Sequence, residues 1–283
     1  MVFEELINPL QAESHPKAVF IHSILYVSLG LFLALWIFED YASLVMIFLT
    51  TMAAIPLVER IIRIEEKKDL SNLSEMGLLK EHSKALRVFM AYFFGATLAF
   101  AIWYVLLPAD ISANLFTIQE ATLTGLGVDI TGKVYSQFGS FLSILSNNLK
   151  VLLFCLIFSF LYGSGAIFIL TWNASVIGAA MGITVLNGLA QLGLKLHSDF
   201  GLTHISVIFY GLLRYTLHGI PEILAYFVAG LGGGIISVAA IRHDFGSEKF
   251  EKIVMDSTIL ILLSLIILVI AAYLEVYITP MVF

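Results

Sequence analysis

The stretch AVFIHSILYVSLGLFLALWIF, residues 18–38, decides the fold class of this chain. Its 21 residues contain no aspartate, glutamate, lysine or arginine, and about 20 apolar residues in a helix cross the hydrocarbon core of a bilayer. A cleavable secretory signal has a basic segment ahead of a shorter apolar core. The chain instead begins acidic, with Glu4 and Glu5, so we expect residues 18–38 to be a retained membrane span.

Similar apolar runs recur along the 283 residues, of which 59% are hydrophobic and 13% are charged. Soluble domains carry about 25% charged residues. The charges are clustered between the apolar runs, which favours an all-α, polytopic transmembrane helix bundle with about seven membrane segments over a very apolar soluble helical bundle. The segments are expected at about residues 18–38, 41–58, 88–107, 149–171, 175–190, 204–241 and 253–278.

Composition also excludes several classes of function. The net charge of −6 provides no basic footprint for nucleic acid. Cys155 is the single cysteine and lies in an apolar run, which excludes an intrachain disulfide and a cysteine-based metal cluster. The sequence also lacks the Gly-x-Ser-x-Gly and P-loop motifs. We therefore expect no catalytic residues, no cofactor and no metal.

The N-terminal region, residues 1–107, is expected to contain three spans and a charged helical hairpin at residues 59–88. That hairpin holds seven of the fifteen lysines and arginines, which places it in the cytoplasm by the positive-inside rule. The N-terminus is then cytoplasmic in a multi-pass protein of the plasma membrane. Residues 1–16 are amphipathic and form either a helix in the membrane interface or a disordered tail.

Residues 108–146 are expected to form an extracytoplasmic segment. Apolar residues between Tyr135 and Leu145 recur at three- and four-residue spacing, which predicts an interfacial helix. Asn147 and Asn148 would then cap the fourth span, and Asn173 would form the turn into the fifth. Residues 147–283 make up the C-terminal transmembrane region.

The most informative polar pattern lies in the sixth apolar segment. Arg214, His218 and Glu222 are spaced four apart, so on a continuous helix they would form one stripe. Gly219 and Pro221 predict a broken or re-entrant helix near residues 204–241, with one long tilted helix as the alternative. The three ionisable side chains either lock the bundle together or form a substrate, ion or proton site. The His-Glu-x-x-His zinc signature is absent.

Small residues recur on the fifth span and after Pro221. Such rows allow helix backbones to approach closely, so we expect these helices to pack together within one chain; a homodimer is the alternative. The predicted packing residues are Gly178, Gly182, Ala225, Ala229, Gly230 and Gly234.

From Asn147 onward, the chain resembles the stage II sporulation protein M family of integral membrane proteins. The resemblance covers about residues 140–245. It is carried by Asn147-Asn148, Gly163-Ser164-Gly165, Asn173, and His218-Gly219-Ile220-Pro221-Glu222 followed by small residues. It implies a multi-span protein without a settled enzymatic activity, and the namesake holds cell-wall hydrolases at a membrane during engulfment of the forespore. It also implies importance for Asn147, Asn148, Asn173, His218, Gly219 and Glu222.

The leading hypothesis is a non-enzymatic membrane scaffold or complex subunit. Residues 59–88 and 108–146 would be its docking surfaces, and its partners would be membrane lipids and membrane or extracytoplasmic proteins. The alternative is a transporter or channel with an ion, proton or small-solute site at Arg214, His218 and Glu222. An intramembrane hydrolase is a more distant third.

Overall fold

A computed structural model describes residues 9–70, 74–131, 137–193 and 202–282. In these ranges the regular elements are helical, and seven helices are long and apolar enough to cross a membrane. The predicted all-helical membrane protein with about seven spans is thereby confirmed. In chain order the elements are α1 (Pro9–Ser14), α2 (Pro16–Ile37), η2 (Glu39–Tyr41), α3 (Ala42–Asp69), α4 (Glu75–Leu106), α5 (Ala109–Leu115), α6 (Thr117–Thr131), α7 (Gln137–Tyr162), α8 (Ala166–Gln191), α9 (Leu202–Arg242), α10 (Glu248–Tyr273), η3 (Leu274–Ile278) and α11 (Thr279–Val282).

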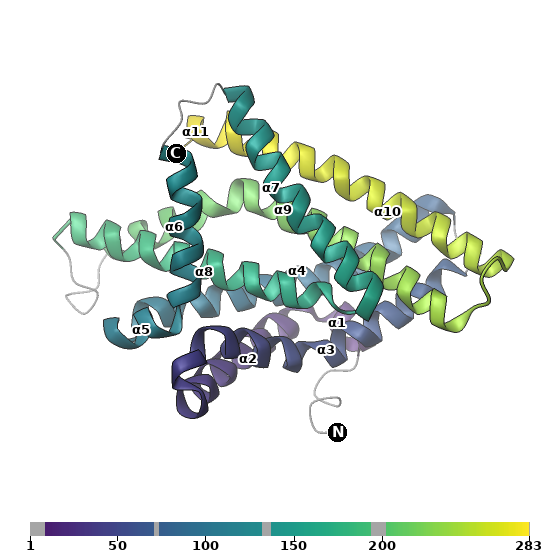
Figure 1. Cartoon of the computed structure of the whole chain (residues 1–283), viewed down its shortest axis with the longest axis horizontal. Helices are drawn as coiled ribbons and strands as arrows, with labels where there is room; N and C mark the ends of the chain where they lie inside the picture. Colours follow the sequence, from purple (N-terminus) through teal and green to yellow (C-terminus); the bar gives the residue numbers. More distant parts are fainter. Residues whose placement is uncertain (1–8, 71–73, 132–136, 194–201, 283) are drawn as a thin grey trace.

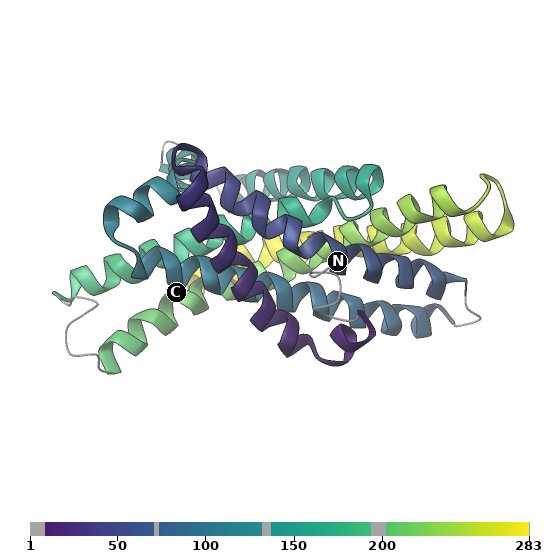
Figure 2. The same cartoon turned by 90° about the horizontal axis from the view of Figure 1, so that it is seen from below.

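Most of the seven long helices run roughly along the longest axis of the molecule, whereas α2 and α7 are steeply inclined to it and α6 lies across the bundle (Figures 1 and 2). Helix α2 packs against α3 and α4, α4 packs against α8, and α9 packs against α7 and α10. The C-terminal end of α3, the N-terminal end of α4 and the α9–α10 connection lie at the same end of the bundle (Figures 1 and 2). We call this end, which carries residues 59–88 and 242–253, the basic end.

The crosswise helix α6 is anchored at the opposite end by a fully buried amide. Gln119 Oε1 accepts a hydrogen bond from Ser43 Oγ of α3 at 2.8 Å. Gln119 Nε2 donates one to Ser175 Oγ of α8 at 3.2 Å. Because both ends of the amide are satisfied, its burial is stabilising, and one side chain joins three helices.

Small residues allow close contacts between helices of the same chain. A Cβ on Gly178 of α8 would lie 2.6 Å from Phe100 Cβ and 2.9 Å from the Thr97 carbonyl oxygen of α4. A Cβ on Gly234 of α9 would lie 2.9 Å from the Gly163 carbonyl oxygen. Gly182 likewise faces Tyr104 of α4, Gly230 faces Ala166 of α8, and Ala225 and Ala229 are buried on α9.

Helices α3 and α4 are longer than a bilayer requires. Their 28 and 32 residues correspond to about 42 and 48 Å, against a hydrocarbon core of about 30 Å. Their apolar parts therefore fit the bilayer, while residues 59–69 and 75–87 extend beyond it. The charged hairpin expected at residues 59–88 is not charged on its outer face alone, because Glu65, Glu66, Asp69 and His82 are buried on its inward face. Residues 71–73 lie outside the described part.

The predicted turn at Asn173 is also wrong. The α7–α8 turn lies ten residues earlier, where Gly163 has a φ of 64° that glycine adopts without strain. Asn173 lies inside α8, and its Nδ2 donates to the Ile169 carbonyl oxygen at 2.8 Å. Helix α7 already begins at Gln137, so Asn147 and Asn148 do not cap it. The apolar positions between 137 and 145 are the first turns of this helix, and no separate interfacial helix is described there.

The predicted break at residues 218–222 is absent as well. Helix α9 continues for 41 residues through Pro221, in agreement with the alternative of one long helix. Pro221 removes one backbone donor, but surrounding helices allow a proline inside a membrane helix. The amphipathic stretch predicted at residues 1–16 is described from Pro9 onward, where α1 begins.

Candidate functional site

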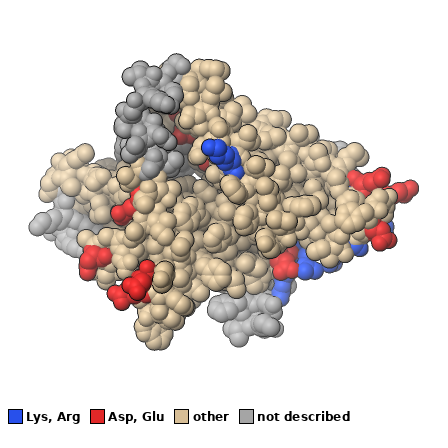
Figure 3. Space-filling view, viewed as in Figure 1, with Lys and Arg blue, Asp and Glu red and all other residues tan. Residues whose placement is uncertain are grey.

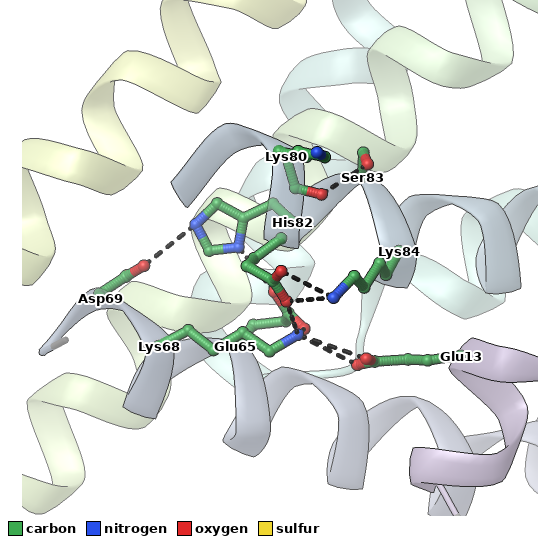
Figure 4. A network of polar contacts seen from close by, with 9 residues as sticks. Glu13, Glu65, Lys68, Asp69, Lys80, His82, Ser83 and Lys84 are labelled. Atoms are coloured by element: carbon green, nitrogen blue, oxygen red, sulfur yellow. Dashed lines mark hydrogen bonds and ion pairs between the residues drawn. The ribbon is translucent and has the colours of Figure 1, made fainter. Parts of the chain in front are cut away.

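A buried histidine between two buried carboxylates lies at the basic end. His82 of α4 is 2% exposed, and Glu65 and Asp69 of α3 are at most 1% exposed. His82 Nδ1 lies 2.7 Å from Glu65 Oε2, and Nε2 lies 3.0 Å from Asp69 Oδ1 (Figure 4). The second contact is an ion pair without hydrogen-bond alignment, since neither Asp69 oxygen has a hydrogen-bond partner among the described residues.

The repeat of α3 explains why these carboxylates face inward. Ile61, Ile62, Glu65, Glu66 and Asp69 recur at three- and four-residue spacing, which places them on one helix face, and all five are buried. The apolar stripe of the span thus continues into a stripe of carboxylates. A helix that leaves the bilayer while still packed against its neighbours needs partners for such groups.

The two carboxylates hold His82 in its charged form. Burial lowers the pKa of His82, but the contacts with Asp69 and Glu65 and their negative charges outweigh it and raise the pKa to about 9. Burial raises the pKa of Asp69, with His82 opposing that effect. The imidazolium therefore joins α4 to α3 through charge at neutral pH.

Lys68 extends the cluster to the N-terminal helix. Its Nζ donates to Glu65 Oε1 at 2.6 Å and reaches Glu13 Oε1 of α1 at 3.3 Å (Figure 4). It also lies 3.8 Å from Glu81 Oε2 of α4. One partly buried lysine thus connects α1, α3 and α4.

Glu66 connects α3 to the far end of α9. Its Oε2 accepts a hydrogen bond from Arg242 Nη1 at 2.9 Å, and its Oε1 lies 2.7 Å from His243 Nε2. Glu66 is 1% exposed, so its buried negative charge needs these two positively charged or hydrogen-bonding partners. We refer to Glu65, Glu66, Lys68, Asp69, His82, Arg242 and His243 together as the ion-pair clasp.

A second polar cluster lies among the apolar parts of α7 and α9. Tyr226 is fully buried, and its hydroxyl donates to Glu222 Oε1 at 2.8 Å. Asn148 of α7 is a polar neighbour of the same carboxylate. Its buried Nδ2 has no aligned hydrogen bond among the described residues. Glu275 of the π-helical segment η3 is near enough to Glu222 to interact through charge.

The structure brings together only part of the predicted polar cluster. Asn148 and Glu222 are neighbours, whereas Asn147 is exposed and Asn173 bonds within its own helix. Gly219 lies one turn before Glu222. The side chains of Arg214 and His218 lie outside the described part of the structure. No group of three or more metal-ligating side chains occurs among the described residues.

Sequence reasoning missed both the clasp and two members of the second cluster. A signal for the clasp was present, because Glu65, Glu66 and Asp69 continue the spacing of Ile61 and Ile62. Tyr226 follows Glu222 by four residues, which places it on the same helix face. The approach of Arg242 and His243 to α3, across more than 170 residues, has no local signal.

The family model described as stage II sporulation protein M matches residues 89–280. This chain belongs to the stage II sporulation protein M family. An uncharacterized protein of Methanocaldococcus jannaschii is 31% identical over 144 residues, which are 50% of this chain and 71% of that protein. No solved structure matches the chain.

The match to the stage II sporulation protein M family extends the resemblance seen in the sequence in both directions. It begins at Phe89 within α4, so α2, α3 and the first part of α4 precede it. The clasp crosses this boundary, since Arg242 and His243 lie inside the matched region and Glu66 lies outside it.

Proposed function

We propose that this member of the stage II sporulation protein M family is a non-enzymatic membrane scaffold or complex subunit. The observation that carries the proposal is the pair of contacts from Glu66 to Arg242 and His243. Breaking one partner of a buried ion pair costs about 3–5 kcal/mol. The N-terminal helices are therefore held firmly on the family region.

Polar contacts at both ends support a bundle of fixed shape. The clasp joins α1, α3, α4 and α9 at the basic end, and Gln119 joins α3, α6 and α8 at the opposite end. Alternating access requires one group of helices to rock against another, which would break several of these contacts together.

The outward face of residues 59–88 is the proposed docking surface. The buried carboxylates of α3 face inward, whereas Arg63, Lys67, Lys80 and Arg87 are exposed. Figure 3 shows lysine and arginine side chains gathered along one edge near the basic end. This surface fits an acidic segment of a protein partner. By the positive-inside rule it faces the cytoplasm, with the N-terminus on the same side, and residues 108–146 offer a second surface on the other side.

Site-specific crosslinking in native membranes tests the docking surface. A photoreactive amino acid at position 76, next to the exposed lysines, should capture a partner through an acidic peptide. Exchange of Lys67, Lys80 and Arg87 for glutamate should abolish this capture. The matched control is Glu248→Lys, at an exposed acidic position of the same end. Capture of only a second copy of the chain, or capture unaffected by the charge reversal, would contradict the proposal.

A flux assay separates the scaffold from a transporter. Liposomes that contain the purified protein should hold a pH gradient as long as empty liposomes do. Glu222→Gln should alter thermal stability without altering that leak. A leak that depends on the protein and disappears in Glu222→Gln would show that the protein is a transporter and would contradict the scaffold proposal.

A further inference from the structure

A cavity of about 400 Å³ lies between α2, α4, α8 and α9. Its walls include Phe20, Phe93, Thr97, Met181, Gly219 and Ile223. Phe93 and Ile223 are each 2% exposed, so these parts of the wall are deep in the protein. Nearly all of the lining is apolar, as is usual for a small-molecule site of this size.

The cavity opens sideways, toward the surroundings of the bundle. Phe94 of α4 is 36% exposed and Ile220 of α9 is 38% exposed, and both line the cavity. Both residues belong to the apolar parts of their helices, away from the charged ends of the bundle. What surrounds such a position in a membrane is hydrocarbon, so lipid chains have direct access to the opening.

Gly219 contributes empty space to the cavity wall. A Cβ at this position would meet no atom within 4 Å, in contrast to Gly178 and Gly234, where a Cβ would collide with a neighbouring helix. Close helix packing therefore does not account for glycine at position 219. A larger side chain at this position would project into the cavity without displacing a helix.

We propose that this cavity binds one membrane lipid, whose hydrocarbon chain enters between Phe94 and Ile220. The bound chain fills the space beside Gly219 and becomes part of the packing between α4 and α9. This site is separate from the docking surface and from the clasp, so it does not depend on the scaffold role.

The test uses the full chain in vesicles of phosphatidylcholine and phosphatidylglycerol that contain a phosphatidylcholine with a diazirine on one acyl chain. After illumination, peptides are analysed by mass spectrometry. We expect label on the peptides that carry buried Phe93 and Ile223, in addition to label on lipid-facing Phe154 and Leu262. Gly219→Leu should reduce the label at the buried positions roughly tenfold and leave Phe154 unchanged.

Two further variants make the result decisive. Gly219→Ala adds only a methyl group and should fold like the wild type while reducing the buried label partially. Thr97→Val keeps the shape of this wall residue and should leave the label at the buried positions as in the wild type. Label confined to lipid-facing residues, label unaffected by Gly219→Leu, or a segment of a second copy crosslinked in the cavity would overturn the proposal.

Discussion

Replacement of His82 by glutamine is the sharpest test of the clasp. Glutamine keeps a polar side chain of moderate size but cannot become positively charged. Asp69 then loses its counter-charge, and Glu65 keeps only Lys68. The pKa of His82 is raised from 6.5 to about 9, which corresponds to about 3 kcal/mol of folding stability. That free energy corresponds to a fall in melting temperature of about 6–12 °C for a chain of this size.

The stabilisation depends on pH with a definite sign. Because the pKa of His82 is higher in the folded chain than in the unfolded one, its contribution is complete below pH 6.5 and disappears as the pH rises through about 9. Thermal unfolding of the purified protein, followed by circular dichroism across this range, measures the effect. The wild type should lose stability toward alkaline pH, and His82→Gln should show a much flatter profile.

The matched control is Lys84→Gln on the same helix. Lys84 pairs with Glu81, and their side chains are 38% and 29% exposed, so this change should cost less than about 1 kcal/mol. The reasoning fails if His82→Gln costs no more than Lys84→Gln. It also fails if the difference in stability between the wild type and His82→Gln is the same below pH 6.5 as above pH 9.

Three further substitutions test the packing and the polar contacts, each by its melting temperature in detergent. Glu66→Gln should cost about 3–5 kcal/mol because it removes a buried counter-charge, whereas Glu59→Gln, at a side chain that is 45% exposed, should cost less than about 1 kcal/mol. Equal effects would contradict a structural role for the clasp. Gly178→Leu should prevent close helix packing and yield little folded protein, while Gly219→Ala should be neutral or stabilise by up to about 1 kcal/mol. Tyr226→Phe should cost about 1–3 kcal/mol, since it removes a hydrogen bond to a carboxylate, and an unchanged melting temperature would show that this bond is unimportant.

The comparison of variants on α3 and α4 also separates two roles of the same segment. His82 and Glu66 act on stability because they are buried, whereas Lys67 and Lys80 are exposed and should affect only partner capture. A charge reversal that lowers the melting temperature as much as His82→Gln would mean that the outward face is also structural. The two faces of one hairpin can thus be tested independently.

Local patterns in the sequence determine that this chain is a helical membrane protein with about seven spans. An uninterrupted apolar run depends only on the composition of about 20 consecutive residues. It therefore predicts a span whatever the arrangement of the helices. The sequence also identifies the small residues of α8 and α9, because close packing requires them wherever the partner lies. The family membership is similarly readable from a short motif around Glu222.

Tertiary structure decides the boundaries, the partners and the orientation of charge. The turn at Gly163 and the continuity of α9 through Pro221 depend on neighbouring helices that no local pattern describes. Whether a glutamate on α3 faces water or is buried depends on which helix lies beside it, and Arg242 reaches Glu66 only after the chain has crossed the bundle several times. Electrostatic contacts act through space, so the clasp exists only once the helices are in place.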